Sequence, residues 1–377
     1  MSVFSLPRVF AVLMKEFTQM RRDRLTYAMM LVVPVVQLML FGYAINSDPK
    51  HLPTGVLAED HSTLARSTIQ ALQTSDYFDI VREAKTSDEL DRMMATGEIQ
   101  FAVTIPADFS RRVIRRDRPQ ILIEADASDP TAAAGALAAA SGLSSQALSH
   151  DLKGAAQPTR PTPPPFEIVV HRKYNPENLS SYNIVPGLLG VVLSMTLVMM
   201  TALAMTRELE RGTMESLLAT PVRPIEVMVG KLAPYVVVGL VQASVILTLA
   251  RLLFHVPMEG GWAALGTGVL MFIVGSLALG FLISTVARNQ LQAMQLSFFY
   301  MLPSILLSGF MFPFRGMPEW AQWIGTAVPV THFLRIVRGA LLKGHGFLEM
   351  WPSLSALVIF VLAVTALAMA RYRTTLD

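Results

Sequence analysis

The chain has 377 residues, of which 52% are hydrophobic and only 16% are charged, and its mean hydropathy is +0.45. Soluble globular domains carry about 25% charged residues, so this composition favours a membrane protein. The net charge is +3 and the pI is near 9.2, but in so apolar a chain the cations are expected beside membrane helices, not on nucleic acid. The absence of cysteine excludes disulfides, thiolate metal sites and cysteine nucleophiles.

Residues 1–24 contain five basic residues, and Phe10, Leu13, Phe17 and Met20 fall on one stripe of a helix. This pattern predicts a cytoplasmic interfacial helix on the inner leaflet, with a short soluble helix as the alternative. The apolar run that follows is too long for a signal peptide and has no A-x-A cleavage site, so it is expected to remain as an anchor.

Six apolar stretches are long enough to cross a bilayer core of about 30 Å, which needs roughly 20 residues of helix. None of them contains Asp or Glu. These stretches are 25–45, 184–206, 232–254, 265–287, 294–312 and 353–370. The sequence therefore predicts an all-α membrane protein with six transmembrane helices.

Basic residues beside the predicted spans indicate which ends face the cytoplasm. The short segments that would lie inside hold twelve basic residues, and those that would lie outside hold four. The inside segments are 1–24, 207–231, 288–293 and 371–377, and the outside ones are 255–264 and 313–352. Both termini are therefore predicted to be cytoplasmic, and the large segment 46–183 is predicted to lie outside.

Residues 46–183 are expected to form an inserted extracytoplasmic α/β domain. Apolar runs such as TGVLA, FDIV and QILIEA alternate with helical stretches, which is typical of a sheet backed by helices. The Pro-rich run 157–165 is expected to act as a stiff linker. The arginine cluster between Arg111 and Arg118 is interpreted as a solvated face, with docking of a partner as the alternative. No metal-ligand spacing is present among the scattered histidines.

The loop 207–231, RELERGTMESLLATPVRPIEVMVGK, has the most unusual chemistry. Its glutamates interleave with basic residues, a short helix can begin after Gly212, and Pro221 ends it. Leu217 and Leu218 give that helix an apolar edge. A soluble partner could bind such a helix at the inner end of a bundle; a plain connecting loop is the alternative.

This loop resembles the signature of the permease subunits of type-2 ABC exporters. The matching residues are Arg207, Glu208, Glu210, Gly212, Thr213, Glu215, Leu217, Leu218, Thr220, Pro221, Gly230 and Lys231. The stretch 174–190 resembles the family's entry into its second membrane helix, and 312–344 resembles its outer loop before the last helix. The resemblance covers nearly the whole chain. One departure is Lys173, where the family usually has an aromatic residue; it is expected to alter only local docking at the outer surface.

The resemblance implies a coupling helix around residues 212–220 that sits in a cleft of an ATPase subunit. It implies polar contacts with that subunit through three glutamates and apolar contacts through two leucines. These residues are Glu208, Glu210, Glu215, Leu217 and Leu218. The alternative is that the acids only balance neighbouring arginines.

The chain is not expected to be an enzyme or to bind a cofactor. The nearest P-loop candidate, around Gly230-Lys231, has Ile225 where the first glycine belongs and Leu232 in place of Ser or Thr. The spans lack the carboxylates typical of ion-driven carriers. ATP and Mg²⁺ are therefore expected on a separate ATPase subunit.

Polar residues inside the spans are few. Ser194, Thr196, Gln242 and Ser244 are the candidates for a substrate path, and hydrogen bonding between helices is their commoner alternative role. Small residues recur every four or eight positions in the fourth span, which favours helix packing over a dimer seam. They are Gly268, Ser276, Gly280 and Ser284.

The resemblance implies a permease in the bacterial inner membrane that exports a substrate from the cytoplasm, and the apolar, Met-rich composition suits a drug-like or lipid-like cargo. The resemblance implies a dimer with a second copy or a relative, two ATPase subunits, and two short re-entrant helices in 313–352 that dip into the outer leaflet. The large outer domain raises the hypothesis of a periplasmic adaptor. A non-transporting scaffold or receptor of the same topology is the alternative; a membrane-embedded enzyme lacks its motifs.

Overall fold

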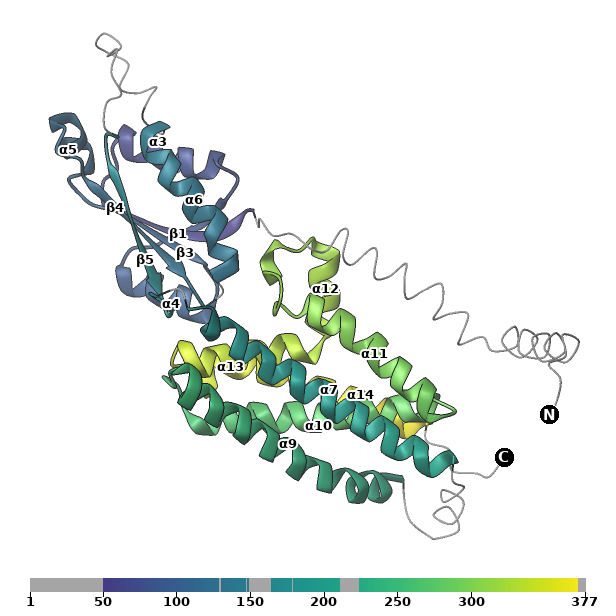
Figure 1. The fold of residues 1–377 in the computed structure, drawn as a ribbon. Coiled ribbons are helices and arrows are strands. Elements are labelled where there is room, and N and C mark those ends of the chain that lie inside the picture. Colours follow the sequence, from purple (N-terminus) through teal and green to yellow (C-terminus); the bar gives the residue numbers. More distant parts are fainter. Residues whose placement is uncertain are drawn as a thin grey trace, which may run out of the picture. The chain divides into compact units, whose positions relative to one another are not determined.

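The alternating apolar runs before residue 174 form a five-stranded sheet in a computed structural model of the chain (Figure 1). The structure describes residues 50–371, apart from 129, 147, 149–163, 178 and 211–223. The strands are β1 (Leu52–Ala58), β2 (Phe78–Glu83), β3 (Phe101–Ile105), β4 (Gln120–Asp126) and β5 (Glu167–Lys173). Their order is β2-β1-β3-β4-β5, in which only β3 and β4 pair antiparallel.

Several predicted segments lie outside the described residues. They are the interfacial helix 1–24, the first span 25–45, most of the Pro-rich linker 157–165, the middle of the loop 207–231 and the tail beyond Arg371.

Four helices cover the two faces of the sheet (Figure 1). They are α3 (Thr63–Thr74), α4 (Ser87–Thr96), α5 (Phe109–Arg115) and α6 (Pro130–Gln146). Because side chains alternate along a strand, Val56 of β1 lies in a buried cluster with residues of α3, α5 and α6. Its neighbour Leu57 packs with α4 on the opposite face. The predicted sheet backed by helices is therefore present, with both of its faces covered.

Asp60 joins the beginnings of two of these helices. Its carboxylate accepts hydrogen bonds from the backbone N–H of Ser62 at 2.8 Å and of Ser110 at 2.6 Å. Burial acts to raise the pKa of Asp60, but the hydrogen bonds from Ser110 and Ser62 outweigh it and lower this pKa to about 2. The ionised carboxylate therefore stabilises the fold of this region.

Asp60→Asn should lower the stability of the sheet region by about 1 to 2 kcal/mol at neutral pH. A depressed carboxyl pKa gives stability that is complete above the unfolded pKa near 4 and is lost as the pH falls through about 2. Hydrogen exchange of the α3 and α5 amides in the full chain should be about tenfold faster in the variant at pH 7, and this difference should shrink below pH 4. Asp79→Asn, at an exposed position of β2, is the control. Equal exchange in both variants would contradict the assignment.

Within the part of the chain that the structure describes, four helices are long and apolar enough to cross a membrane. They are α7 (Ser180–Glu210), α9 (Pro224–Phe254, apolar from Leu232), α10 (Trp262–Val286) and α14 (Phe347–Arg371). Each contains or overlaps one predicted span. The fifth predicted span, 294–312, corresponds to α11 (Gln290–Leu307), which is not among these four. The count of six transmembrane helices therefore remains a prediction.

The end of α11 differs from the expected end at residue 312. The helix stops at Leu307 because Ser308 caps it and Gly309 adopts φ +82°, a left-handed conformation that ends helices. The outer loop then forms the short turn η2 (Phe314–Gly316) and two short helices, α12 (Glu319–Ala327) and α13 (Pro329–Leu342). Two short helices in this loop were implied by the resemblance; their depth in the membrane remains a prediction.

Helix α10 packs against α7 and α13. A Cβ at Gly280 would lie 2.5 Å from the backbone oxygen of Val198 on α7, and a Cβ at Gly268 would lie 2.6 Å from Ile336 on α13. The rings of Phe272 and Phe333 stack with centroids 4.1 Å apart. The small residues of α10 at 268 and 280 therefore serve close packing within the chain, which is the interpretation that the sequence favoured over a dimer seam.

Candidate functional site

Only the two ends of the predicted coupling loop 207–231 lie within the described residues. Helix α7 ends at Glu210 and α9 begins at Pro224. The candidate residues between them lie outside the described residues; they are Gly212, Thr213, Glu215, Leu217, Leu218, Thr220 and Pro221. Glu208 and Glu210 lie in the last turn of α7, where Glu208 is half-buried and Glu210 is exposed.

Glu210 connects the end of α7 to the start of α11. Its carboxylate accepts hydrogen bonds from the backbone N–H of Gln290, at 2.8 Å, and from the side-chain amide of the same residue. Gln290 is the first residue of α11, and the positive end of a helix dipole favours an acid there. The sequence analysis assigned Glu210 to contacts with a partner or to balancing neighbouring arginines, whereas the structure shows its carboxylate bonded to Gln290 within the chain.

Two of the four substrate-path candidates are brought together. The side-chain amide of Gln242 on α9 donates a hydrogen bond to the hydroxyl of Thr196 on α7 at 3.1 Å. The amide oxygen of Gln242 is buried without a hydrogen-bond partner in the described part of the chain. Ser244 instead bonds the carbonyl of Leu240 in its own helix and is exposed. The structure therefore supports Gln242 and Thr196 as a polar pair between helices, and separates Ser244 from it.

Ser194 lies on a different face of α7 from Thr196, since two residues turn a helix by about 200°. It is 4% exposed and lies close to the hydroxyl of Tyr300 on α11. That hydroxyl is buried and lies near the side chains of Ser194 and Ser304. Tyr300 was not among the site residues predicted from the sequence. A tyrosine inside an apolar helix still indicates a polar contact there, since its hydroxyl needs a polar partner when it is buried.

A second site joins the sheet to the membrane helices through the Tyr174-Asn175-Pro176 motif. Tyr174 has φ +69° and packs against both the helical core and the buried cluster beside α4. Asn175 is fully buried, and its side chain bonds both the N–H and the carbonyl of Leu179 at the entrance to α7. The motif therefore fixes the direction in which the chain leaves the sheet.

Charged groups surround this motif. The ammonium of Lys343, just after α13, lies 5.1 Å from the centre of the Tyr174 ring and pairs with the carboxylate of Asp126 at the end of β4. The side chains of Lys343 and Asp126 are only 10% and 9% exposed. Burial, followed by the charges of Asp126, Asp91 and Glu124, raises the pKa of the Tyr174 hydroxyl to about 12. The ring therefore remains neutral at physiological pH.

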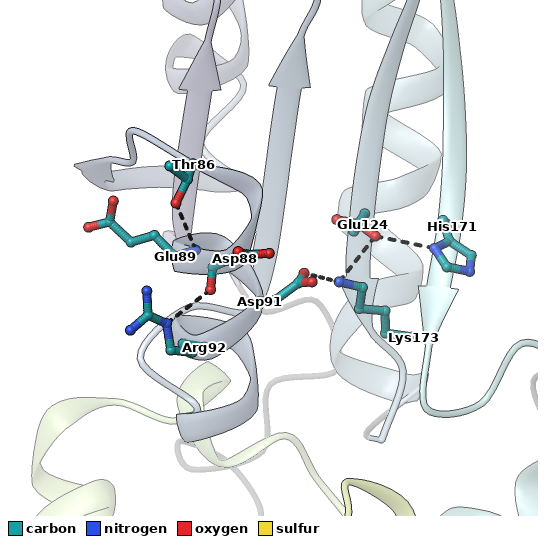
Figure 2. Close-up of polar contacts among 8 residues, drawn as sticks. All are labelled: Thr86, Asp88, Glu89, Asp91, Arg92, Glu124, His171 and Lys173. Atoms are coloured by element: carbon teal, nitrogen blue, oxygen red, sulfur yellow. Dashed lines mark hydrogen bonds and ion pairs between the residues drawn. The ribbon is translucent and has the colours of Figure 1, made fainter.

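Lys173, the departure from the family pattern, has a defined structural role. Its ammonium pairs with Asp91 of α4 and with Glu124 of β4, the latter at 3.2 Å, and Glu124 also meets His171 at 3.3 Å (Figure 2). Burial acts to lower the pKa of Lys173, but the hydrogen bonds that its ammonium donates to Asp91 and Glu124 outweigh it and raise this pKa. Lys173 thus remains charged and ties α4 to the ends of β4 and β5.

The outer loop contacts the same end of the sheet region. The guanidinium of Arg315 donates a hydrogen bond to the carbonyl of Gly97, the residue that caps α4. The guanidinium of Arg338 on α13 donates to the side chain of Asn183 in the first turn of α7 and to the carbonyl of Gly309 at 3.2 Å. The outer loop is therefore bound both to the sheet region and to the start of α7.

Long apolar helices linked by these polar junctions define a multi-pass membrane protein. The sequence matches the family model described as "ABC-2 family transporter protein" over residues 24–370, so the chain belongs to that family and is a membrane permease of this type.

Similar proteins include the "Probable multidrug ABC transporter permease YbhS" of Escherichia coli K12, which is 29% identical over 345 residues, 91% of this chain and 90% of that protein. "Probable multidrug ABC transporter permease YbhR" of the same organism is 26% identical over 369 residues, 97% of this chain and 98% of that protein. "ABC transporter G family member 20" of Dictyostelium discoideum is 25% identical over 369 residues, which are 94% of this chain but 50% of that protein. No solved structure matches the chain at a significant level.

Proposed function

We propose that this chain is the permease subunit of an ATP-driven exporter whose ATPase is a separate polypeptide. The observation that carries the proposal is the continuous helix α7, whose 31 residues lead from the outer junction at Tyr174 to the loop 207–231. A helix of this length spans about 46 Å, enough to cross a membrane and extend beyond it. A force applied to the loop by a soluble partner would therefore reach the outer side through one continuous helix.

Contacts along α7 support this transmission. At its inner end, Glu210 binds the start of α11. At its outer end, Asn183 binds Arg338 of α13, and Asn175 fixes the link to the sheet. Between these ends, α7 packs closely on α10 at Gly280. A shift of α7 would thus move α10, α11 and α13 together, which is the kind of rigid-body change that alternating access requires.

Glu210→Ala is expected to uncouple ATP hydrolysis from transport without releasing the ATPase. The substitution removes the two hydrogen bonds to Gln290, so that α7 can move without α11. In vesicles with the ATPase, substrate efflux should fall about tenfold while ATPase co-purification stays near the wild-type level. Glu177→Ala, which changes an exposed glutamate before α7, next to the opposite end of that helix from Glu210, is the control. Loss of ATPase binding in the Glu210 variant would instead assign this carboxylate directly to the partner interface.

Within this proposal, the polar pair between α7 and α9 is the first candidate point on the substrate path. A buried polar atom without a partner costs about 1 to 3 kcal/mol. The amide oxygen of Gln242, which has no partner among the described residues, is therefore a candidate acceptor for a hydrogen-bond donor on the cargo. The other spans present mostly apolar side chains, which suits a drug-like or lipid-like substrate. Ser194 and Tyr300 form a second candidate point on the path.

Gln242→Leu should weaken the binding of cargo that carries a hydrogen-bond donor by about tenfold, while apolar analogues should be unaffected. This difference is measured as the efflux of two matched substrates. One carries the hydrogen-bond donor, and in the other the donor group is blocked by methylation. Ser244→Ala is the matched control on the same helix. If both substrates respond equally to Gln242→Leu, the residue has only a packing role.

We propose that the chain lies in the bacterial inner membrane with both termini cytoplasmic and the sheet region outside, and that it pairs with a second copy or a relative.

In this arrangement the arginine cluster faces away from the membrane. The register pairs Asp126 with Lys173 at the end of β4 and β5 that leads to Tyr174, and Gln120 with Glu167 at the other end. The cluster precedes Gln120, so it lies about 20 Å from the junction.

The arginine cluster is a candidate surface for a periplasmic adaptor with an acidic face. Ile114, within it, is 72% exposed, and Arg116 and Arg118 adopt left-handed backbone angles of +64° and +48°. Such angles are unfavourable for residues other than glycine, so the backbone at these two arginines carries a conformational cost. A crosslinker placed at Arg112 should capture the adaptor in intact cells; recovery of the permease alone would contradict an adaptor at this surface.

Crosslinking also tests the proposed ATPase contact. Because the chain has no cysteine, Glu215→Cys introduces a single thiol in the loop. This thiol should crosslink to the ATPase in assembled complexes, whereas Arg112→Cys should not. Equal crosslinking at both positions, or none at position 215, would refute the proposed interface.

A further inference from the structure

A cavity of about 370 Å³ lies between α6 and β5. This volume falls within the range of small-molecule binding sites. Its lining is apolar except for one guanidinium and consists of Ala127, Ala133, Ala134, Leu137, Ala138, Val170 and Arg172. The cavity is open because α6 presents alanines here, whose single methyl groups leave space above the strand.

The position of the cavity follows from the register of the sheet. Ala127 follows the end of β4, and its backbone N–H donates to the carbonyl of Lys173 at the end of β5. Tyr174, the next residue, packs against the helical core. The cavity therefore lies at the end of the sheet from which the chain enters α7.

Arg172 has no charged partner among the described residues at this end of the sheet. Its neighbours Lys173 and His171 point to the other face of β5, where they share Glu124, and Lys173 also holds Asp91 (Figure 2). The carboxylate of Asp126 forms an ion pair with the ammonium of Lys343. Arg172 is exposed and makes no hydrogen bond or ion pair within the described residues. The nearby acids are thus already paired, and a guanidinium remains free beside an apolar cavity.

We propose that this cavity binds a single-tailed amphipathic anion. The apolar tail would lie against the alanines of α6 and Val170, and the carboxylate, sulfonate or phosphate head would bind Arg172, whose planar guanidinium suits oxyanions. The volume is at the lower end of the range for small-molecule sites, which favours one chain over a two-chain phospholipid. The proposal depends on the geometry of the sheet region and does not require the chain to be an exporter.

Photolabelling of the full chain tests this site. The chain is placed in nanodiscs of neutral phosphatidylcholine and labelled with undecanoic acid that carries a diazirine near its tail, and the labelled peptides are mapped by mass spectrometry. Label is expected on peptides from α6 and β5. The methyl ester of the same probe, which lacks the charge, should label these peptides at least tenfold less. Nanodiscs that also contain phosphatidylglycerol should not compete, since a two-chain lipid does not fit.

Two variants test separately the charge of Arg172 and the volume of the cavity. Arg172→Gln removes the charge and keeps the cavity, and Ala134→Trp fills the cavity and keeps the charge; each should reduce labelling at least fivefold. Arg66→Gln, which removes an exposed charge on α3, should leave labelling unchanged. Equal labelling by the acid and the ester, label confined to the membrane helices, or unchanged labelling in both cavity variants would overturn the proposal. Competition by phosphatidylglycerol would overturn the single-tailed assignment. ATP-dependent efflux, measured separately, distinguishes failure of this site from failure of the proposed function.

Discussion

Lys343→Glu is expected to abolish most transport and to loosen the junction between the sheet and the membrane helices. The substitution leaves Asp126 without its cation and places a second acid beside it, where both side chains are about nine-tenths buried. Breaking a buried ion pair costs about 3 to 5 kcal/mol. It also removes the cation above the Tyr174 ring. Efflux should fall at least tenfold, and the amides of β4 and α13 should exchange faster with solvent.

The reversed pair tests this interpretation. Asp126→Lys combined with Lys343→Glu should recover part of the lost efflux, because the attraction is restored although Asp126 also accepts a hydrogen bond from the Ser128 N–H. Lys50→Glu is the control, since Lys50 and Asp76 are 3.9 Å apart and at least half exposed, and such a pair contributes little. If Lys343→Glu behaved like Lys50→Glu, the junction would have no mechanical role.

Glu215→Arg should release the ATPase from the permease. Under the proposed coupling role, Glu215 contacts the ATPase, so reversing its charge creates a repulsive contact and leaves a partner cation unpaired. Such changes at a buried interface cost about 2 to 5 kcal/mol, which lowers affinity by more than tenfold. Co-purification of the two subunits should be lost, and efflux with it.

The matched substitution lies nearby in sequence. Glu226→Arg makes the same charge change beyond the proposed coupling helix and should retain the ATPase. Parallel loss of the ATPase in both variants would indicate general disruption of the loop. Retention in both would remove Glu215 from the interface.

Much of the architecture was predictable because it depends on local patterns. Uninterrupted apolar runs predicted α7, α9, α10 and α14, and short apolar runs between helical stretches predicted strands such as β1 and β4. The end of α11 was missed because it depends on the backbone angle of Gly309, which an apolar run that continues to Phe312 does not reveal.

The polar junctions were not predictable, because their members are far apart in the chain. Asp126 and Lys343 are 217 positions apart, and Arg315 and Gly97 are 218 apart. Without the fold, Lys173 was only a departure from a family pattern, whereas the structure places it between α4 and β4. Among the path candidates, Ser244 forms its hydrogen bond within its own helix, since a serine in a helix can bond the carbonyl four residues before it.

The most direct test of the account is transport by purified components. The permease is reconstituted in liposomes with and without its ATPase, and cargo movement is measured with ATP, with a nonhydrolysable ATP analogue, and with a proton gradient alone. We predict movement only when the ATPase and hydrolysable ATP are both present. Cargo movement by the permease alone, or movement driven by the proton gradient, would contradict the claim that α7 and its inner loop transmit work from a separate ATPase.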